Sequence, residues 1–239
     1  MRYLMTKYVI ANWKCHKKSG DARQWFDNFA ELYEPQDGVE VIVAPSYICL
    51  ENLAAYVKDL NLENVHLAAQ DVSPFPRGGY TGAVAADMVK DFAGYVIIGH
   101  SERRRYFHET SQDVINKVSE VADAGLIPIV CVEYSSAHFQ LSPLVDIELK
   151  DLIVAYGPVD SLSFRIPESP EKVEESLAHF SAIHGNWPMV YGGALQPSNV
   201  EEYFVLPSLA GVFVGASSLD AVQFATIVKK AQLIAGTRF

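Results

Sequence analysis

Short runs of apolar, often β-branched residues recur along the whole chain. They cover residues 8–11, 39–44, 65–68, 95–98, 127–132, 152–155, 189–191 and 212–214. Short runs that are apolar on both faces are typical of strands in a parallel sheet that is buried on both sides. The pattern therefore predicts about eight strands.

Longer stretches with helical periodicity lie between the predicted strands. Three of them follow residues that favour helix starts, namely 112–124 after Ser111, 171–180 after Ser169-Pro170, and 199–204 after Pro197-Ser198. Strands and helices therefore alternate, which indicates a parallel sheet covered by helices. About eight such units favour an α/β protein with a closed (β/α)8 TIM barrel, a single domain over residues 1–239. The pattern alone also fits an open, doubly wound sheet.

Composition and charge exclude several function classes. The 239 residues are 49% hydrophobic and 20% charged, which is typical of a globular protein with a large core. The formal net charge of −10 and the lack of a basic tract argue against nucleic-acid or anionic-membrane binding. No apolar run approaches the roughly 20 residues that cross a bilayer, so we expect a soluble, cytoplasmic protein. Cys15, Cys49 and Cys131 show no metal-binding spacing, so we expect reduced thiols and no metal site.

Polar residues follow two of the predicted strands. Asn12 and Lys14 come directly after the first strand, and His100 and Glu102 come after the fourth. Because the carboxyl ends of barrel strands carry active sites, Lys14 could hold an anion, His100 could donate a proton, and Glu102 could orient Lys14. The simpler interpretation is a surface lysine beside a packing tryptophan, and a core histidine before a solvated helix start. Each pair alone leaves both interpretations open.

Small residues follow the last two predicted strands. Gly192 and Gly193 come after the seventh strand, and Gly215 and Ala216 come after the eighth. Backbone N–H groups in such turns can close on a phosphate, helped by the N-terminus of a helix. Glycines also mark ordinary turns, so each turn alone is a weak signal.

Taken in order, these motifs resemble the triosephosphate isomerase family. The matching segments run from Ala11 to about Asp220 and are Asn-x-Lys at 12–14, Gly-His-Ser-Glu-Arg-Arg at 99–104, Tyr-Gly-Gly at 191–193 and Val-Gly-x-x-Ser-Leu at 214–219. Further matches are Ala-Gln-Asp at 69–71, Gly-Tyr-Thr-Gly at 79–82 and Ala-Tyr-x-Pro-Val at 155–159. The resemblance implies a closed barrel that interconverts dihydroxyacetone phosphate and glyceraldehyde 3-phosphate without a cofactor.

The resemblance also implies roles for single residues at the site. Lys14 would offset the negative charge of the substrate, and Asn12 would help to orient it. His100 would polarise the substrate oxygens as a neutral imidazole, with Glu102 as a supporting acid.

Phosphate binding and dimerisation follow from the resemblance as well. The implied phosphate site is formed by Gly192, Gly193, Gly215 and Ala216. The family is usually a homodimer, in which the loop between Asp71 and Gly82 would insert into the partner subunit with Thr81 at its tip.

The main departure from the family pattern follows the sixth predicted strand. The family's catalytic base is the glutamate of Tyr-Glu-Pro, whereas this chain has Gly157 between Tyr156 and Pro158. A positioned general base contributes about 10²–10⁴-fold to the rate, so we predict weak or lost isomerase activity. Asp160 and Glu133 are the conceivable replacement acids. We expect neither to serve, because Asp160 is short and Glu133 is better placed to support its loop.

The lid and the phosphate turns also depart from the family. Residues 158–165 read Pro-Val-Asp-Ser-Leu-Ser-Phe-Arg, where the family usually has Pro-Val-Trp-Ala-Ile-Gly-Thr-Gly. Arg165 could grip a phosphate through its guanidinium, and a solvated loop arginine is the equally simple alternative. Ala194 replaces a serine and Ala216 a glycine, so a hydroxyl is lost and a positive φ at residue 216 would be strained.

Three functions remain open from the sequence. The chain is an isomerase with weak proton transfer, a catalytically silent barrel that binds a phosphorylated metabolite or a protein, or an enzyme that acts differently on a three-carbon phosphate. Schiff-base chemistry at Lys14 is disfavoured, because nothing in the local sequence supplies the apolar pocket that lowers the pKa of an amine.

Overall fold

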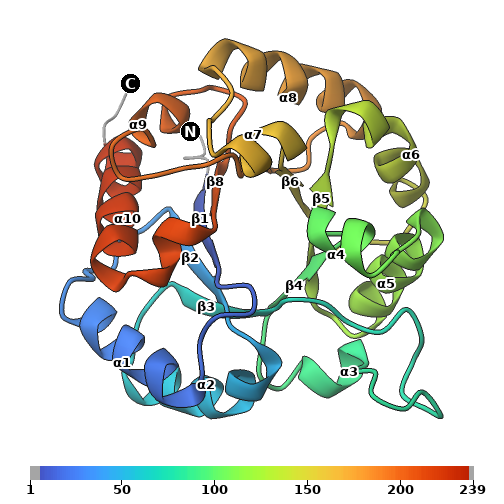
Figure 1. Ribbon diagram of the computed structural model, residues 1–239, viewed down its shortest axis with the longest axis horizontal. Helices are drawn as coiled ribbons and strands as arrows, with labels where there is room; N and C mark the ends of the chain where they lie inside the picture. The colour runs from blue at the N-terminus through green and yellow to red at the C-terminus, as the bar shows by residue number, and fades with distance from the viewer. Residues whose placement is uncertain (1–5, 237–239) are drawn as a thin grey trace.

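The computed structural model describes residues 6–236, except for the side chains of residues 162–164. Eight parallel strands form a closed barrel in sequence order, as Figure 1 shows. The strands are β1 (Lys7–Asn12), β2 (Val39–Ala44), β3 (Val65–Ala69), β4 (Tyr95–Ile98), β5 (Ile127–Val132), β6 (Ile153–Tyr156), β7 (Met189–Tyr191) and β8 (Gly211–Val214). The predicted closed barrel is therefore confirmed, and the open sheet is excluded. The predicted boundaries 1 and 239 lie outside the described residues.

The barrel closes between its first and last strands. Tyr8 of β1 lies opposite Gly211 of β8, and the pairing continues to Ala11 opposite Val214. A Cβ atom at residue 211 would lie 2.0 Å from the Tyr8 carbonyl oxygen. Glycine is therefore required where the two strands meet.

The strands are buried on both faces, which explains their continuous apolar runs. One cluster fills the barrel and contains residues that point inward from several strands, among them Ile10, Ile42, Ile97 and Ile129. A larger cluster packs between the strands and the surrounding helices, with Phe26 as one of its fully buried members. Two apolar layers on opposite faces of one sheet are the normal arrangement of this architecture.

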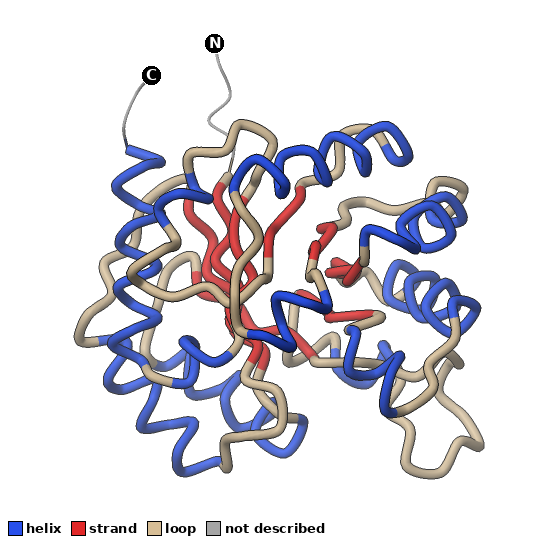
Figure 2. The backbone as a smooth tube through the Cα atoms, turned by 45° about the horizontal axis from the view of Figure 1, so that its top comes forward, coloured by secondary structure: helices blue, strands red, loops and turns tan. Residues whose placement is uncertain are grey.

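Helices surround the barrel, as the tube view in Figure 2 shows. They are α1 (Ser19–Ala30), α2 (Tyr47–Asp59), α3 (Ala86–Val89), α4 (Ser101–Tyr106), α5 (Ser111–Asp123), α6 (Ala137–Leu141), α7 (Val159–Phe164), α8 (Pro170–His184), α9 (Glu201–Phe204) and α10 (Ala221–Gly236), with 3-10 turns η1 (Tyr134–Ser136), η2 (Ser142–Leu144) and η3 (Ala216–Leu219). Within residues 6–236, no helix has the length and apolarity that a membrane span requires.

The predicted helix starts are correct to within two residues. Ser169 caps α8, where its side chain accepts a hydrogen bond from the Lys172 N–H. The cap of α5 is Thr110 and not Ser111, because Thr110 and Asp113 form a reciprocal capping box. Helix α9 begins at Glu201, two residues later than predicted, after a turn.

Candidate active site

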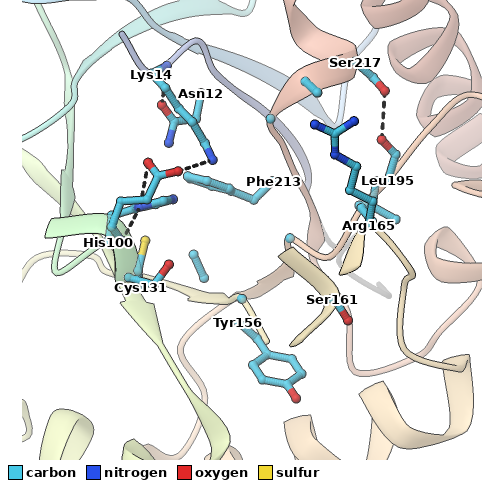
Figure 3. A pocket seen from close by; sticks show the side chains of 18 of the residues that line it. Asn12, Lys14, His100, Cys131, Tyr156, Ser161, Arg165, Leu195, Phe213 and Ser217 are labelled. Atoms are coloured by element: carbon cyan, nitrogen blue, oxygen red, sulfur yellow. Dashed lines mark hydrogen bonds and ion pairs between the residues drawn. The ribbon is translucent and has the colours of Figure 1, made fainter. Parts of the chain in front are cut away.

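A cavity of about 460 Å³ lies at the carboxyl ends of the barrel strands. We call it the strand-end cavity. Its lining includes Asn12, Lys14, His100 and Glu102 from the first and fourth strand ends, together with Gly157 from the sixth. Figure 3 shows Lys14, Asn12 and His100 gathered on one side of it. The cavity falls in the range of about 300–1,000 Å³ that is usual for small-molecule sites.

Lys14 is held in an unusual backbone conformation by its neighbours. Its φ angle is +52°, in the left-handed region that non-glycine residues seldom adopt. The Asn12 side-chain oxygen accepts a hydrogen bond from the Lys14 N–H at 3.0 Å, and the Gln70 amide donates to the Lys14 carbonyl at 2.9 Å. These bonds direct the side chain past Gly215 to Glu102, where Nζ lies 2.7 Å from Oε1. Asn12 therefore positions Lys14 through the backbone.

His100 is buried and neutral. Burial lowers its pKa to about 4, an effect that outweighs the opposing influence of the Glu102 carboxylate. Nδ1 caps helix α4 by accepting a hydrogen bond from the Glu102 N–H at 3.2 Å. The single ring proton of the neutral imidazole is therefore on Nε2. His100 can donate one hydrogen bond to a bound molecule.

The two turns that follow β7 and β8 meet at the cavity. Gly192, Ala194, Gly215 and Ala216 line it, and the Ser217 hydroxyl links the turns by donating to the Leu195 carbonyl at 3.0 Å. The positive φ in these turns falls at Ala194, with φ +51°, and not at Ala216. The backbone strain of a left-handed alanine, which the sequence suggested for Ala216, therefore occurs at Ala194.

Gly193 is not among the described cavity-lining residues. A Cβ atom there would lie 2.0 Å from the hydroxyl oxygen of Tyr191. The close approach of this tyrosine explains why residue 193 is a glycine.

The predicted lid contains a short helix. Residues Val159–Phe164 form α7, and Arg165 follows it with φ +57°. Ser161 and Arg165 line the cavity, and Figure 3 shows Arg165 beside Leu195 and Ser217, across from Lys14 and His100. The side chain of Phe164 lies outside the described part of the chain.

Neither of the two acids considered as a replacement base, Asp160 and Glu133, is among the described lining residues of the strand-end cavity. Gly157 lines the cavity, and its N–H donates to the Val132 carbonyl at 3.2 Å. Asp160 is exposed and is not a described lining residue. Glu133 also lies outside the described lining, because Arg104 holds its Oε1 at 2.6 Å from Nη2. Glu102, paired with Lys14, is the sole acid among the described lining residues.

Comparisons with known proteins decide the family. The triosephosphate isomerase family model matches residues 7–231. The chain belongs to the triosephosphate isomerase family. The triosephosphate isomerase of Colwellia psychrerythraea is 34% identical, with 94% of this chain and 97% of the relative covered. Those of Symbiobacterium thermophilum (33%; 94% and 96% covered) and Xanthomonas euvesicatoria (32%; 94% and 98% covered) are similar over the same extent.

Several other residues line the cavity of this triosephosphate isomerase family member and were given no role in the site from the sequence. Among them are His16, Arg104, Cys131, Ser161 and Phe213. Cys131 and Phe213 point inward from β5 and β8, so alternation along those strands is the signal that could have found them. Burial raises the pKa of the Cys131 thiol to about 12, so it is not an activated nucleophile. Within residues 6–236, no three metal-ligating side chains come together.

Proposed function

We propose that the strand-end cavity binds a phosphorylated three-carbon compound and that its triosephosphate isomerase activity is weak or lost. The observation that carries this proposal is Gly157 in the cavity lining, where the described residues offer no acid except Glu102. Glu102 is held by Lys14, which leaves no free carboxylate to remove a proton from carbon. Loss of a general base removes about 10²–10⁴-fold in rate, or roughly 3–5.5 kcal/mol of barrier lowering.

The four residues to which we assign ligand binding, Asn12, Lys14, His100 and Glu102, all line the cavity. Lys14 offsets the negative charge of the ligand, Asn12 positions Lys14, and the Nε2–H of His100 donates to a ligand oxygen. Glu102 supports both, because its carboxylate pairs with Lys14 and its backbone N–H fixes the tautomer of His100. A neutral imidazole suits a donor role, since it polarises an oxygen without giving up its proton in the resting state.

The phosphate lies against the two turns, whose lining residues Gly192, Gly215 and Ala216 are small and permit close approach. The Gly192 N–H already donates to the Tyr156 carbonyl at 2.8 Å, so the backbone N–H groups of Gly215 and Ala216 are the donors that we assign to the phosphate. Arg165 adds a guanidinium from the lid side of the same cavity.

A catalytically silent barrel is the second candidate function. The same observation favours it, because an intact set of binding groups beside a missing base permits binding without turnover. Its ligand is a phosphorylated metabolite, or a protein partner that uses this face.

We further propose that the chain is a cytoplasmic homodimer and that residues 1–239 form one domain. Support for the dimer comes from the loop between Asp71 and Gly82, which extends away from the barrel between β3 and α3 (Figures 1 and 2). Phe75 and Tyr80 stack in this loop with ring centroids 4.6 Å apart, and each is 44% exposed. Exposed aromatic side chains on a projecting loop are well suited to a partner surface. Thr81 would reach the partner from the same loop.

Two measurements on the purified protein test the proposed function. The first is turnover of glyceraldehyde 3-phosphate, and the second is calorimetric titration with a phosphate-bearing enediolate analogue. Binding with slow turnover supports the weak isomerase, and binding with no turnover supports the silent barrel. Absence of both turnover and binding would contradict the proposal that the strand-end cavity holds a phosphorylated three-carbon compound.

A further inference from the structure

Glu168 lies between the lid and helix α8, and its carboxylate is largely buried. The side chain is 10% exposed. A buried carboxylate is costly unless it is hydrogen-bonded or paired with a cation. Here Oε2 accepts a hydrogen bond from the Tyr156 hydroxyl at 2.7 Å, and Oε1 pairs with the Lys172 ammonium. Both carboxylate oxygens are therefore satisfied by partners within the chain.

The hydrogen bond between Tyr156 and Glu168 spans the base of the lid. Tyr156 is the last residue of β6 and comes shortly before the lid, residues 158–165. Glu168 follows the lid, with |i−j| = 12 between the two partners. Ser161 and Arg165, which belong to the lid and line the strand-end cavity, lie between them in the sequence. The bond therefore joins the two ends of the segment that carries the lid.

The Tyr156 hydroxyl makes this bond away from the cavity. Tyr156 is among the lining residues, but Figure 3 shows its ring pointing away from the cavity, into the apolar cluster between the strands and the helices. Burial raises the pKa of Tyr156, and the Glu168 carboxylate raises it further, so the phenol keeps its proton at neutral pH. Ser176 of α8 donates to the same hydroxyl oxygen at 3.3 Å. The bond therefore lies outside the space that a ligand would occupy.

The main chain of Glu168 is bonded as well. Its N–H donates to the Tyr191 hydroxyl at 2.9 Å, and its carbonyl accepts from the Tyr203 hydroxyl at 2.6 Å. Lids open through φ and ψ changes at a few residues near their ends. Such a change at Glu168 would break its main-chain bonds and pull its carboxylate away from Tyr156. The carboxylate bond is the charge-assisted one of the three, and such bonds are roughly twice as strong as neutral ones.

We propose that the hydrogen bond from Tyr156 to the Glu168 carboxylate is a latch that holds the lid over the strand-end cavity before any ligand binds. The latch keeps Ser161 and Arg165 in the cavity lining of the empty protein. Glu168 is a positioning residue, because it is not among the described lining residues and acts through the lid. This inference goes beyond the proposed function and does not depend on it, since it concerns the protein without ligand.

Trypsin cleavage after Arg165 measures the opening of the lid. Arg165 and Ile166 are exposed, but a protease binds an extended segment, so the lid must open locally before the bond between them is cut. When opening and closing are fast compared with cleavage, the cleavage rate follows the population of the open form. The full chain without ligand would be incubated with trypsin, and mass spectrometry would quantify the fragment that ends at Arg165. Urea unfolding of each variant would verify a cooperative fold.

Two single variants each remove one partner of the latch. Glu168→Ala and Tyr156→Phe should each raise the rate of cleavage after Arg165 at least about tenfold, a factor that corresponds to about 1.4 kcal/mol. The double variant should exceed the faster single variant by less than about twofold, because both changes remove the same bond. Lys172→Met is the matched control. It removes only the ion pair of Glu168 with a lysine that is 64% exposed, and should change the rate less than about threefold.

Urea separates local opening of the lid from unfolding of the barrel. Opening of the lid exposes little surface, so the cleavage rate should depend only weakly on urea well below the unfolding midpoint. A urea dependence as steep as that of global unfolding would overturn the latch, because the whole barrel would then have to open.

Three other results would also overturn it. Unchanged cleavage in a folded Glu168→Ala variant would show that the carboxylate does not hold the lid. Faster cleavage in Glu168→Ala but not in Tyr156→Phe would show that the bond between them is not the latch. An equal increase in Lys172→Met would assign the effect to the surface ion pair instead.

Discussion

Restoring a carboxylate at residue 157 should restore isomerisation. In Gly157→Glu the backbone stays anchored, because the N–H of residue 157 is bonded to the Val132 carbonyl. Lys14, His100 and Glu102 are expected to keep their present geometry, so the added glutamate would supply the general base that we propose is missing. We expect the rate with glyceraldehyde 3-phosphate to rise at least about 10²-fold, or roughly 3 kcal/mol of barrier. The lower end of the range applies, because Arg165, which has no ion-pair partner among the described residues, also lines the cavity and can pair with the new carboxylate, which reduces its basicity.

The control for this rescue is Gly157→Gln, which has the same shape but accepts no proton and should leave the rate unchanged. Circular dichroism and thermal unfolding would verify that both variants fold. A folded Gly157→Glu variant without increased turnover would refute the reasoning, and the lid and phosphate turns would then be the parts that have lost function. Turnover of the unchanged protein at the rate of ordinary family members would refute it from the other side. In that case Asp160→Asn and Glu133→Gln would identify the acting acid.

Three further outcomes are expected. Lys117 is buried between the carboxylates of Asp71 and Glu109, so Lys117→Met should lower the free energy of unfolding in urea by about 3–5 kcal/mol, while exposed Lys58→Met should change it by less than about 0.5 kcal/mol. Burial lowers the pKa of His100 in the folded protein to about 4 from its ordinary value of 6.5. The unfolded state therefore binds more protons at His100 between these pH values, so stability should fall from pH 6.5 to 4 by roughly 3 kcal/mol more in the unchanged protein than in His100→Gln. Light scattering at micromolar concentration should give the mass of two 26.4 kDa chains; the mass of a single chain would contradict the dimer.

The strands could be predicted from the sequence because their burial is two-sided. A run such as Val39–Ala44 is apolar at nearly every position, so its bounds are visible without knowledge of its neighbours. The eight-fold repeat of such runs, with helical stretches between them, then indicated the closed barrel. The start of α5 was misplaced by one residue, although the Thr110 and Asp113 pair that caps it is a readable local signal.

The site was harder to predict, because its geometry depends on contacts between distant segments. The pairing of Arg104 with Glu133 joins the ends of neighbouring strands across 29 positions, and it removes Glu133 from the cavity. The tautomer of His100 depends on one hydrogen bond, which the backbone N–H of Glu102 donates. Helix α7 was not predicted, because residues 158–165 were compared with the family's lid sequence and not assessed for helical periodicity. The left-handed backbone at Ala194 likewise follows from how two turns meet, which local sequence does not specify.

The Tyr-Gly-Gly motif illustrates how one segment serves both the lid and the binding site. The hydroxyl of Tyr191 covers Gly193 and accepts a hydrogen bond from the N–H of Glu168, just beyond the lid. Tyr203 donates to the Glu168 carbonyl at 2.6 Å, and Tyr156 donates to its carboxylate at 2.7 Å. Three tyrosines from β6, β7 and α9 thus anchor the end of the lid, and none of these bonds involves a side chain at residue 157. Because these bonds to Glu168 do not involve residue 157, the proposed loss of the base leaves the anchoring of the lid unchanged.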